Sequence, residues 1–165
     1  MRRNIVVIAH NLRSAHNVGS LIRTCEGLGV DKIFFTGYTP YPQKPRDVRL
    51  PHISRKIDKQ IDKTALGAQD GLPWDSKEKI GGVIKALSED GYTICALEQA
   101  EESTPLSEFD APHKVALIIG NEVRGLEKEV LDKADTVLEI PMFGKKESFN
   151  AVQAAAMALY RMRFH

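Results

Sequence analysis

Short apolar runs alternate with amphipathic segments along most of this 165-residue chain. The apolar runs are rich in β-branched residues and predict buried strands of a parallel sheet, at residues 4–9, 32–36, 92–97, 115–119 and 136–140. Apolar side chains at helical spacing predict helices at residues 18–28, 76–89 and 126–134, and an alanine-rich helix follows after residue 150. Because strands and helices alternate, we expect one α/β domain, residues 1–165, with a mainly parallel sheet flanked by helices.

The segment between the last strand and the last helix places polar side chains at a helix N-terminus. Pro141 ends the strand, and Ser148 occupies the expected N-cap position, two residues before Asn150. Unpaired N–H groups and the helix dipole attract ligands to such positions in α/β proteins. Helix capping alone is the alternative, because serine is a favoured N-cap residue.

Polar residues and glycines also follow two other predicted strands. They are Asn17, Gly19 and Arg23 after the first strand, and Gly120, Asn121, Glu122 and Gly125 after the fourth. Each has a purely structural alternative, for instance Asn17 as a helix N-cap, Arg23 as an exposed helical side chain and Glu122 as a charge that favours a helix start. Three such clusters after buried strands point to a common site.

Residues 37–74 give a poor secondary-structure signal, because four prolines interrupt the first part. Between residues 44 and 63, seven lysines and arginines stand against three aspartates. This basic flap is either a solvated insertion or a surface that binds phosphates. The candidate RNA-binding residues are Arg13, Lys44, Arg46, Arg49 and Arg55.

The composition is that of an ordinary globular protein, with 42% hydrophobic and 27% charged residues and a net charge of +1. Any nucleic-acid surface must therefore be a local patch. Cys25 and Cys95 lie within predicted elements and are expected to be buried free thiols in a reducing compartment. Neither a signal peptide nor a membrane-spanning run is apparent, so a cytoplasmic location is expected.

Common catalytic signatures are missing. The sequence contains no GxGxxG, GxxxxGK[ST], GxSxG or HExxH motif, which argues against dinucleotide enzymes, P-loop NTPases, α/β-hydrolases and zinc proteases. The five histidines are scattered, and no metal site is expected.

The three polar clusters carry a family resemblance when they are taken together. NxGxxxR at residues 17–23, GNExxGL at residues 120–126 and IPMxGxxxSxN at residues 140–150 resemble the three motifs of SpoU (TrmH-like) RNA methyltransferases of the SPOUT superfamily. Order and spacing match over residues 4–161, and residues 63–68 with Pro73 and Trp74 are also similar. Phe149 departs from the family, which usually has leucine there. No separate RNA-binding extension of the kind that many relatives carry is expected.

The resemblance implies a C-terminal trefoil knot that holds S-adenosylmethionine, methyl transfer to a ribose 2′-hydroxyl of RNA, and a homodimer with active sites at the subunit interface. It assigns catalysis to Arg23, Asn17, Glu122, Ser148 and Asn150. The cofactor would contact Leu97, Gly120, Ile140, Met142, Phe149 and Asn150. A guanidinium is effectively always protonated, so we interpret Arg23 as a clamp on phosphate and developing alkoxide rather than as a base.

Transfer RNA ranks first as the substrate and ribosomal RNA second. A non-catalytic RNA-binding protein of the same fold is one alternative, although Arg23, Glu122 and Asn150 are all present. A small-molecule methyltransferase is the other, and it would have little use for the basic flap.

Overall fold

The computed structural model describes residues 2–165 and places seven strands in one sheet in the order β3-β2-β1-β6-β4-β7-β5. All adjacent strands pair in parallel. The strands are β1 (Asn4–His10), β2 (Lys32–Thr36), β3 (Trp74–Lys77), β4 (Thr93–Leu97), β5 (Thr104–Pro105), β6 (Lys114–Ile119) and β7 (Thr136–Glu139). The α/β class and the parallel sheet are thus confirmed.

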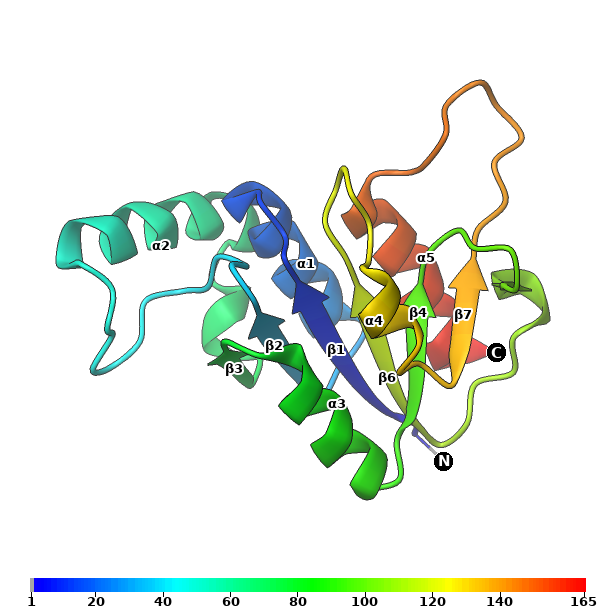
Figure 1. Cartoon of the computed structure of the whole chain (residues 1–165). Helices are drawn as coiled ribbons and strands as arrows, with labels where there is room; N and C mark the ends of the chain where they lie inside the picture. Colours follow the sequence, from blue (N-terminus) through cyan, green and yellow to red (C-terminus); the bar gives the residue numbers. More distant parts are fainter. Residues whose placement is uncertain (1) are drawn as a thin grey trace.

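Helices cover both faces of the sheet (Figure 1). They are α1 (Ala15–Gly27), α2 (Pro51–Ala65), α3 (Ile80–Glu89), α4 (Lys128–Leu131) and α5 (Ala151–Phe164), with short 3₁₀ turns at Ala68–Asp70 and Leu106–Glu108. Alternate residues of β1 face opposite cores: Ile5 and Val7 pack with α1 and α5, whereas Val6 and Ile8 pack with α3 and α4. A strand that is buried on both faces reads as a continuous apolar run, which explains why this one was predictable.

Several predicted boundaries are wrong. The first helix begins at Ala15, three residues earlier than expected, because the hydroxyl of Ser14 caps it and accepts a hydrogen bond from the backbone N–H of Asn17. Asn17 is therefore not an N-cap. The helix expected from residue 76 begins at Ile80, because Trp74–Lys77 instead forms β3 and extends the sheet beside β2. The helix expected over residues 126–134 is only the single turn α4.

The N-cap of the last helix is Asn150 and not Ser148. The side chain of Asn150 accepts a hydrogen bond from the backbone N–H of Val152. Asparagine and serine are comparable caps, and the cap belongs to the residue directly before the first helical turn. Ser148 consequently lies in the loop that precedes α5 and remains exposed.

The 15-residue helix α2 lies within the segment that gave no clear signal. Pro51 stands at the start of this helix, where the missing N–H of proline costs nothing. Only a narrow stripe is buried, formed by Ser54, Ile61 and Ala65. This stripe rests on α1, and the rest of α2 projects away from the sheet (Figure 1). The trefoil knot that the resemblance implies stays a prediction.

Candidate active site

The three motif segments meet at the carboxyl edge of the sheet. Because the strands are parallel, the β1–α1 loop, the loop after β6 and the segment after β7 all leave the sheet at this edge, which is the upper edge in Figure 1. A cavity of about 330 Å³ opens between the ends of β4, β6 and β7 and the start of α5. The sequence clusters are therefore parts of one site.

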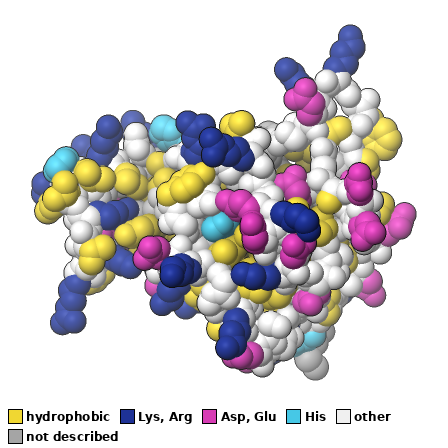
Figure 2. Space-filling view, in the orientation of Figure 1, with side chains coloured by type: hydrophobic (Ala, Val, Ile, Leu, Met, Phe, Trp, Pro, Cys, Tyr) yellow, Lys and Arg dark blue, Asp and Glu magenta, His cyan; other side chains and the backbone are white. Residues whose placement is uncertain are grey.

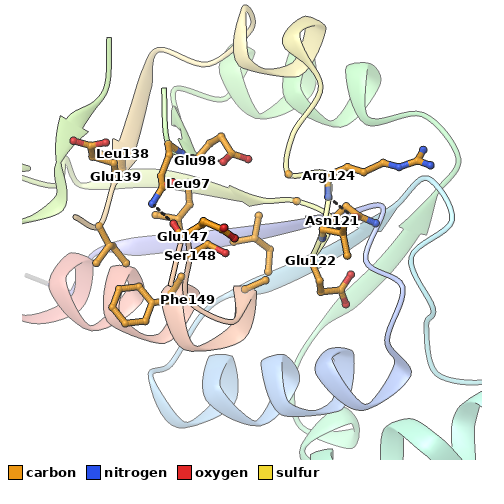
Figure 3. Close-up of a pocket in the computed structure, with 18 residues that line it drawn as sticks. Leu97, Glu98, Asn121, Glu122, Arg124, Leu138, Glu139, Glu147, Ser148 and Phe149 are labelled. Carbon is orange, nitrogen blue, oxygen red and sulfur yellow. Dashed lines mark hydrogen bonds between the residues drawn. The ribbon is translucent and has the colours of Figure 1, made fainter. Parts of the chain in front are cut away.

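Six of the predicted site residues line this cavity, and four do not. Those that line it are Leu97, Gly120, Glu122, Ile140, Ser148 and Phe149 (Figure 3). Asn17, Arg23, Met142 and Asn150 are not among its described lining residues. Asn150 caps α5 next to the cavity wall, and Arg23 is exposed on α1. One chain thus brings the second and third motifs to the cavity directly and the first motif only to its border.

Glu122 joins the second motif to the first. Its carboxylate accepts hydrogen bonds from the backbone N–H groups of Arg13 (2.9 Å) and Ser14 (3.1 Å) and from the side-chain amide of Asn17 (3.0 Å). We call this arrangement the Glu122 clasp. Partial burial raises the pKa of Glu122, but these donors outweigh that effect, and the pKa is lowered overall. The carboxylate is therefore ionised at neutral pH and holds the N-terminus of α1 against the cavity.

Asn121 shapes the loop that carries Glu122. Its side-chain oxygen accepts from the backbone N–H groups of Val123 (2.9 Å) and Arg124 (2.8 Å), and its amide donates to the carbonyl of Asn11 (3.0 Å) and the hydroxyl of Tyr38 (3.1 Å). The side chain is buried and makes both kinds of hydrogen bond, so it fixes the loop against β1 and β2.

Two glycines let this loop fold back tightly. A Cβ on Gly120 would lie 2.8 Å from the carbonyl oxygen of Gly125, and one on Gly125 would lie 2.1 Å from a carboxylate oxygen of Glu98. Gly125 also has a positive φ of 67°. Gly144 in the third motif, by contrast, has open space around it.

The cavity also contains acidic residues that the sequence predictions missed. Glu98 follows β4 and accepts hydrogen bonds from the backbone N–H groups of Gln99 and Leu126, both at 2.9 Å. Glu139 and Glu147 are further lining residues (Figure 3). The position of Glu98 directly after a buried strand was the same signal that singled out the other clusters.

The basic flap divides into a structured loop and a basic helix. Arg49 is largely buried: its guanidinium donates to Asp47 and to the carbonyls of Tyr41 (2.9 Å) and Pro42 (3.1 Å), and it lies 3.7 Å from the Tyr41 ring centroid. This guanidinium lowers the pKa of Asp47. Arg49 therefore holds the loop together and presents no free cation. Lys44 is likewise engaged, since its ammonium donates to the hydroxyl of Ser76 at 2.6 Å.

Exposed cations remain on α2 and beside it. Arg13, Arg46 and Arg55 are exposed, as are Lys56, Lys59 and Lys63. In Figure 2 lysine and arginine side chains gather along the upper left edge, over the region that α2 and the start of α1 occupy in Figure 1. This basic edge adjoins the carboxyl edge of the sheet.

Three further findings concern residues 2–165. Cys25 and Cys95 are buried and free, as predicted, and burial raises the pKa of both thiols. Within these residues no group of three or more histidine, cysteine or acidic side chains could hold a metal ion. The helices in this part of the chain are too short or too polar to cross a bilayer.

Comparison with known proteins agrees with the motifs. The model of the SpoU rRNA Methylase family matches residues 4–160. The chain belongs to this family. The resemblance inferred from the three motifs is therefore confirmed.

Individual members of the SpoU family are similar over the same region. A Staphylococcus saprophyticus protein, named as a member of the TrmH family of tRNA/rRNA methyltransferases, is 32% identical over 157 residues. The alignment covers 95% of this chain and 57% of that protein, so the chain spans little more than half the length of this relative.

Solved structures share the fold. The SpoU methyltransferase AviRb from Streptomyces viridochromogenes, in complex with the cofactor AdoMet, is 25% identical with a TM-score of 0.78, covering 98% of this chain and 57% of that one. The A. aeolicus TrmH/SpoU tRNA modifying enzyme is 22% identical with a TM-score of 0.80, covering 98% of this chain and 74% of that one.

Proposed function

We propose that this chain transfers a methyl group from S-adenosylmethionine to a ribose 2′-hydroxyl of RNA, with tRNA as the first candidate substrate and rRNA as the second. The observation that carries the proposal is the Glu122 clasp, because it holds the first motif against a cavity that the second and third motifs line. Family membership supports the reaction class.

The cavity suits S-adenosylmethionine. Its volume of about 330 Å³ falls within the range of about 300–1,000 Å³ for small-molecule sites. Leu97, Ile140 and Phe149 offer an apolar slot for an adenine ring, and Glu98 and Glu147 offer negative charge to a ligand that bears sulfonium and ammonium groups. When bound, the cofactor supplies a methyl carbon that is activated for attack. Met142 and Asn150 remain predicted contacts of the cofactor.

Arg23 acts as a clamp in the proposed mechanism. A guanidinium carries a positive charge and a fork of N–H donors, so Arg23 binds an RNA phosphate and the alkoxide that develops on the ribose as the hydroxyl proton passes to water. Asn17 and Ser148 hold the arginine or the ribose in place, and Glu122 fixes Asn17. Positioning of this kind supplies a large part of the rate acceleration for a poor nucleophile.

The active site is completed by a second copy of the chain. Arg23 is exposed and lies outside the cavity that its own chain lines. Phe149, Met157, Tyr160 and Phe164, at the start and along the length of α5, are also exposed. A homodimer that buries this apolar face would bring Arg23 of one protomer to the cavity of its partner.

The alternative function is RNA binding without catalysis. A non-catalytic RNA-binding protein of this fold would bind RNA without methylating it. The presence of the clasp and of an exposed Arg23 favours the enzyme, because binding alone needs neither.

The test uses S-adenosylmethionine with a trideuteromethyl group, incubated with the protein and with separate pools of unmodified tRNA and rRNA. Mass spectrometry of the digested nucleosides is expected to show the label on ribose in the tRNA pool, and Arg23→Ala is expected to abolish it. Label on a base would contradict the ribose assignment, label only in rRNA would select the second substrate, and no label in any pool would favour the non-catalytic alternative.

A further inference from the structure

Tyr38 is an exposed aromatic residue that is fixed next to the candidate active site. It follows β2 at the carboxyl edge of the sheet, and 59% of its surface is accessible. The hydroxyl accepts a hydrogen bond of 3.1 Å from the side-chain amide of Asn121, and the backbone N–H of Tyr38 donates to the side-chain oxygen of Asn11 at 3.2 Å. Both the backbone and the tip of the side chain are therefore held while the residue stays open to solvent.

Tyr38 is held in place before any ligand binds. The buried side chain of Asn121 donates a hydrogen bond to the hydroxyl at the tip of the ring, while most of the residue stays exposed. A ring that is already ordered loses little side-chain entropy when a flat ligand packs on it. The arrangement is that of a preformed stacking surface.

The position of Tyr38 in the sheet indicates what would stack there. The cavity lies at the ends of β4, β6 and β7, and β2 lies two strands away from β6 on the side of β3. The basic helix α2 is on the β2 side in Figure 1, with Arg55, Lys59 and Lys63 exposed on it. A polyanionic strand that contacts α2 and delivers a ribose to the cavity therefore passes over the loop that carries Tyr38.

We propose that Tyr38 is a stacking platform for a nucleobase of single-stranded RNA, next to the nucleotide that enters the cavity. The inference rests on the proposed RNA methyltransferase function and adds a binding residue to it. Bases in loops and single strands are unstacked from their neighbours, and proteins bind them on aromatic faces with little dependence on base identity. The exposed cations of α2 bind the phosphates, and Tyr38 binds a base.

A matched pair of variants isolates the aromatic face. Tyr38→Phe and Tyr38→Leu both remove the hydroxyl that accepts from Asn121, but only Tyr38→Leu removes the ring. With bulk tRNA as the probe, Tyr38→Leu is expected to raise the Kd about 10-fold, within the range measured for loss of one stacked base, whereas Tyr38→Phe stays within about 2-fold of wild type. Because both variants lose the same hydrogen bond from Asn121, their melting temperatures and affinities for S-adenosylmethionine should match each other.

The salt dependence of binding separates stacking from charge. Tyr38→Leu should leave the slope of log Kd against log salt unchanged, whereas Lys63→Ala on α2 should reduce this slope by about one. Photo-crosslinking with 5-iodouridine-substituted tRNA transcripts, mapped by mass spectrometry, is expected to give an adduct at Tyr38.

Two results would overturn the inference: equal tRNA affinity of Tyr38→Leu and Tyr38→Phe, or crosslinks that map to other residues and spare Tyr38. Either result leaves the methyltransferase proposal standing as long as the wild-type protein still methylates RNA. If wild type neither binds nor methylates any RNA pool, the proposed function fails together with the inference.

Discussion

The side-chain amide of Asn17 donates a 3.0 Å hydrogen bond to Glu122, a residue 105 positions further along the chain. This bond and the two backbone donors beside it join the start of α1 to the loop after β6. The first and second motifs are therefore one structural unit, and the rigidity of that unit can be tested.

Replacing Glu122 with glutamine should weaken this unit and change its response to acid. Loss of the charged acceptor is expected to cost about 1–2 kcal/mol of unfolding free energy, towards the lower end because the carboxylate is only partly buried. The folded state holds the pKa of Glu122 below its unfolded value. Its contribution is therefore complete above the unfolded pKa and is lost as the pH falls through the lowered one. Urea denaturation at a series of acidic pH values should show a smaller loss of stability for Glu122→Gln than for wild type.

The matched control for this experiment is Glu129→Gln, on the exposed side of α4. It removes the same charge without touching the clasp and should keep the wild-type pH dependence. Parallel pH profiles for wild type and Glu122→Gln would contradict the role of the clasp.

Gly19 in the first motif should be required for packing rather than for chemistry. A Cβ at this position would lie 2.2 Å from the carbonyl oxygen of Ile61 and 2.1 Å from the hydroxyl of Thr64, both on α2. Gly19→Ala is therefore expected to push the two helices apart and to cost about 1–3 kcal/mol of unfolding free energy, as overpacking does. Thermal denaturation measures the effect.

Gly27→Ala is the control in the same helix, because no atom lies within 4 Å of a Cβ built there. Alanine favours helix over glycine, so this variant should be as stable as wild type or slightly more so. A Gly19→Ala protein as stable as Gly27→Ala would show that α2 is not packed on α1 in this way.

Asn11 should support the loop after β6 through a hydrogen bond to Glu127, and the donor and acceptor of this bond can be exchanged by mutation. Its side-chain amide donates to a carboxylate oxygen of Glu127 at 2.9 Å, while its backbone carbonyl accepts from Asn121. Asn11→Asp places two carboxylates together and is expected to cost about 1–2 kcal/mol of unfolding free energy, by leaving polar groups unpaired. Adding Glu127→Gln supplies an amide that donates to the new carboxylate, so the hydrogen bond forms again in the opposite direction and most of the lost stability should return.

Amide exchange at Arg13 and Ser14 reports on the clasp directly, because both N–H groups donate to Glu122. Exchange should accelerate in Asn11→Asp and slow again in the double variant. Failure of the double variant to recover protection would show that Asn11 and Glu127 do not act as a pair.

A shared active site can be detected by mixing two inactive variants. Arg23→Ala removes the proposed clamp, and Ser148→Phe obstructs the cavity wall. Mixed dimers with a shared site would contain one intact site, so a random mixture should regain about a quarter of the wild-type methylation rate. Unshared sites would regain nothing, and sedimentation of wild type as a stable monomer would exclude the dimer itself.

The strands were the most predictable part of the fold. The runs at residues 4–9, 32–36 and 115–119 lie within β1, β2 and β6 or are identical to them, because a strand buried on both faces needs apolar residues at nearly every position. Helix α2 escaped prediction because it buries only a narrow stripe, and β3 did so because three of its four residues are only partly buried and Lys77 is exposed. Both depend on partners that are distant in the sequence.

The candidate site was likewise predictable only in part. Residues after strand ends were predictable, since parallel strands bring their carboxyl ends to one edge. Which of these residues line the cavity could not be predicted, because Asn150 caps a helix and Glu98 follows a strand that none of the motifs includes. In the basic flap, the guanidinium of Arg49 is engaged by Asp47 and two backbone carbonyls.

By itself the sequence determined the α/β class, the parallel sheet and the three motifs that define the family, because periodicity and local spacing are properties of short segments. Only the tertiary structure decided that Glu122 holds Asn17, that Gly19 makes room for α2 and that Tyr38 is fixed at its tip by Asn121. Each of these is a contact between segments far apart in the chain, and its geometry exists only once the sheet has set their distance.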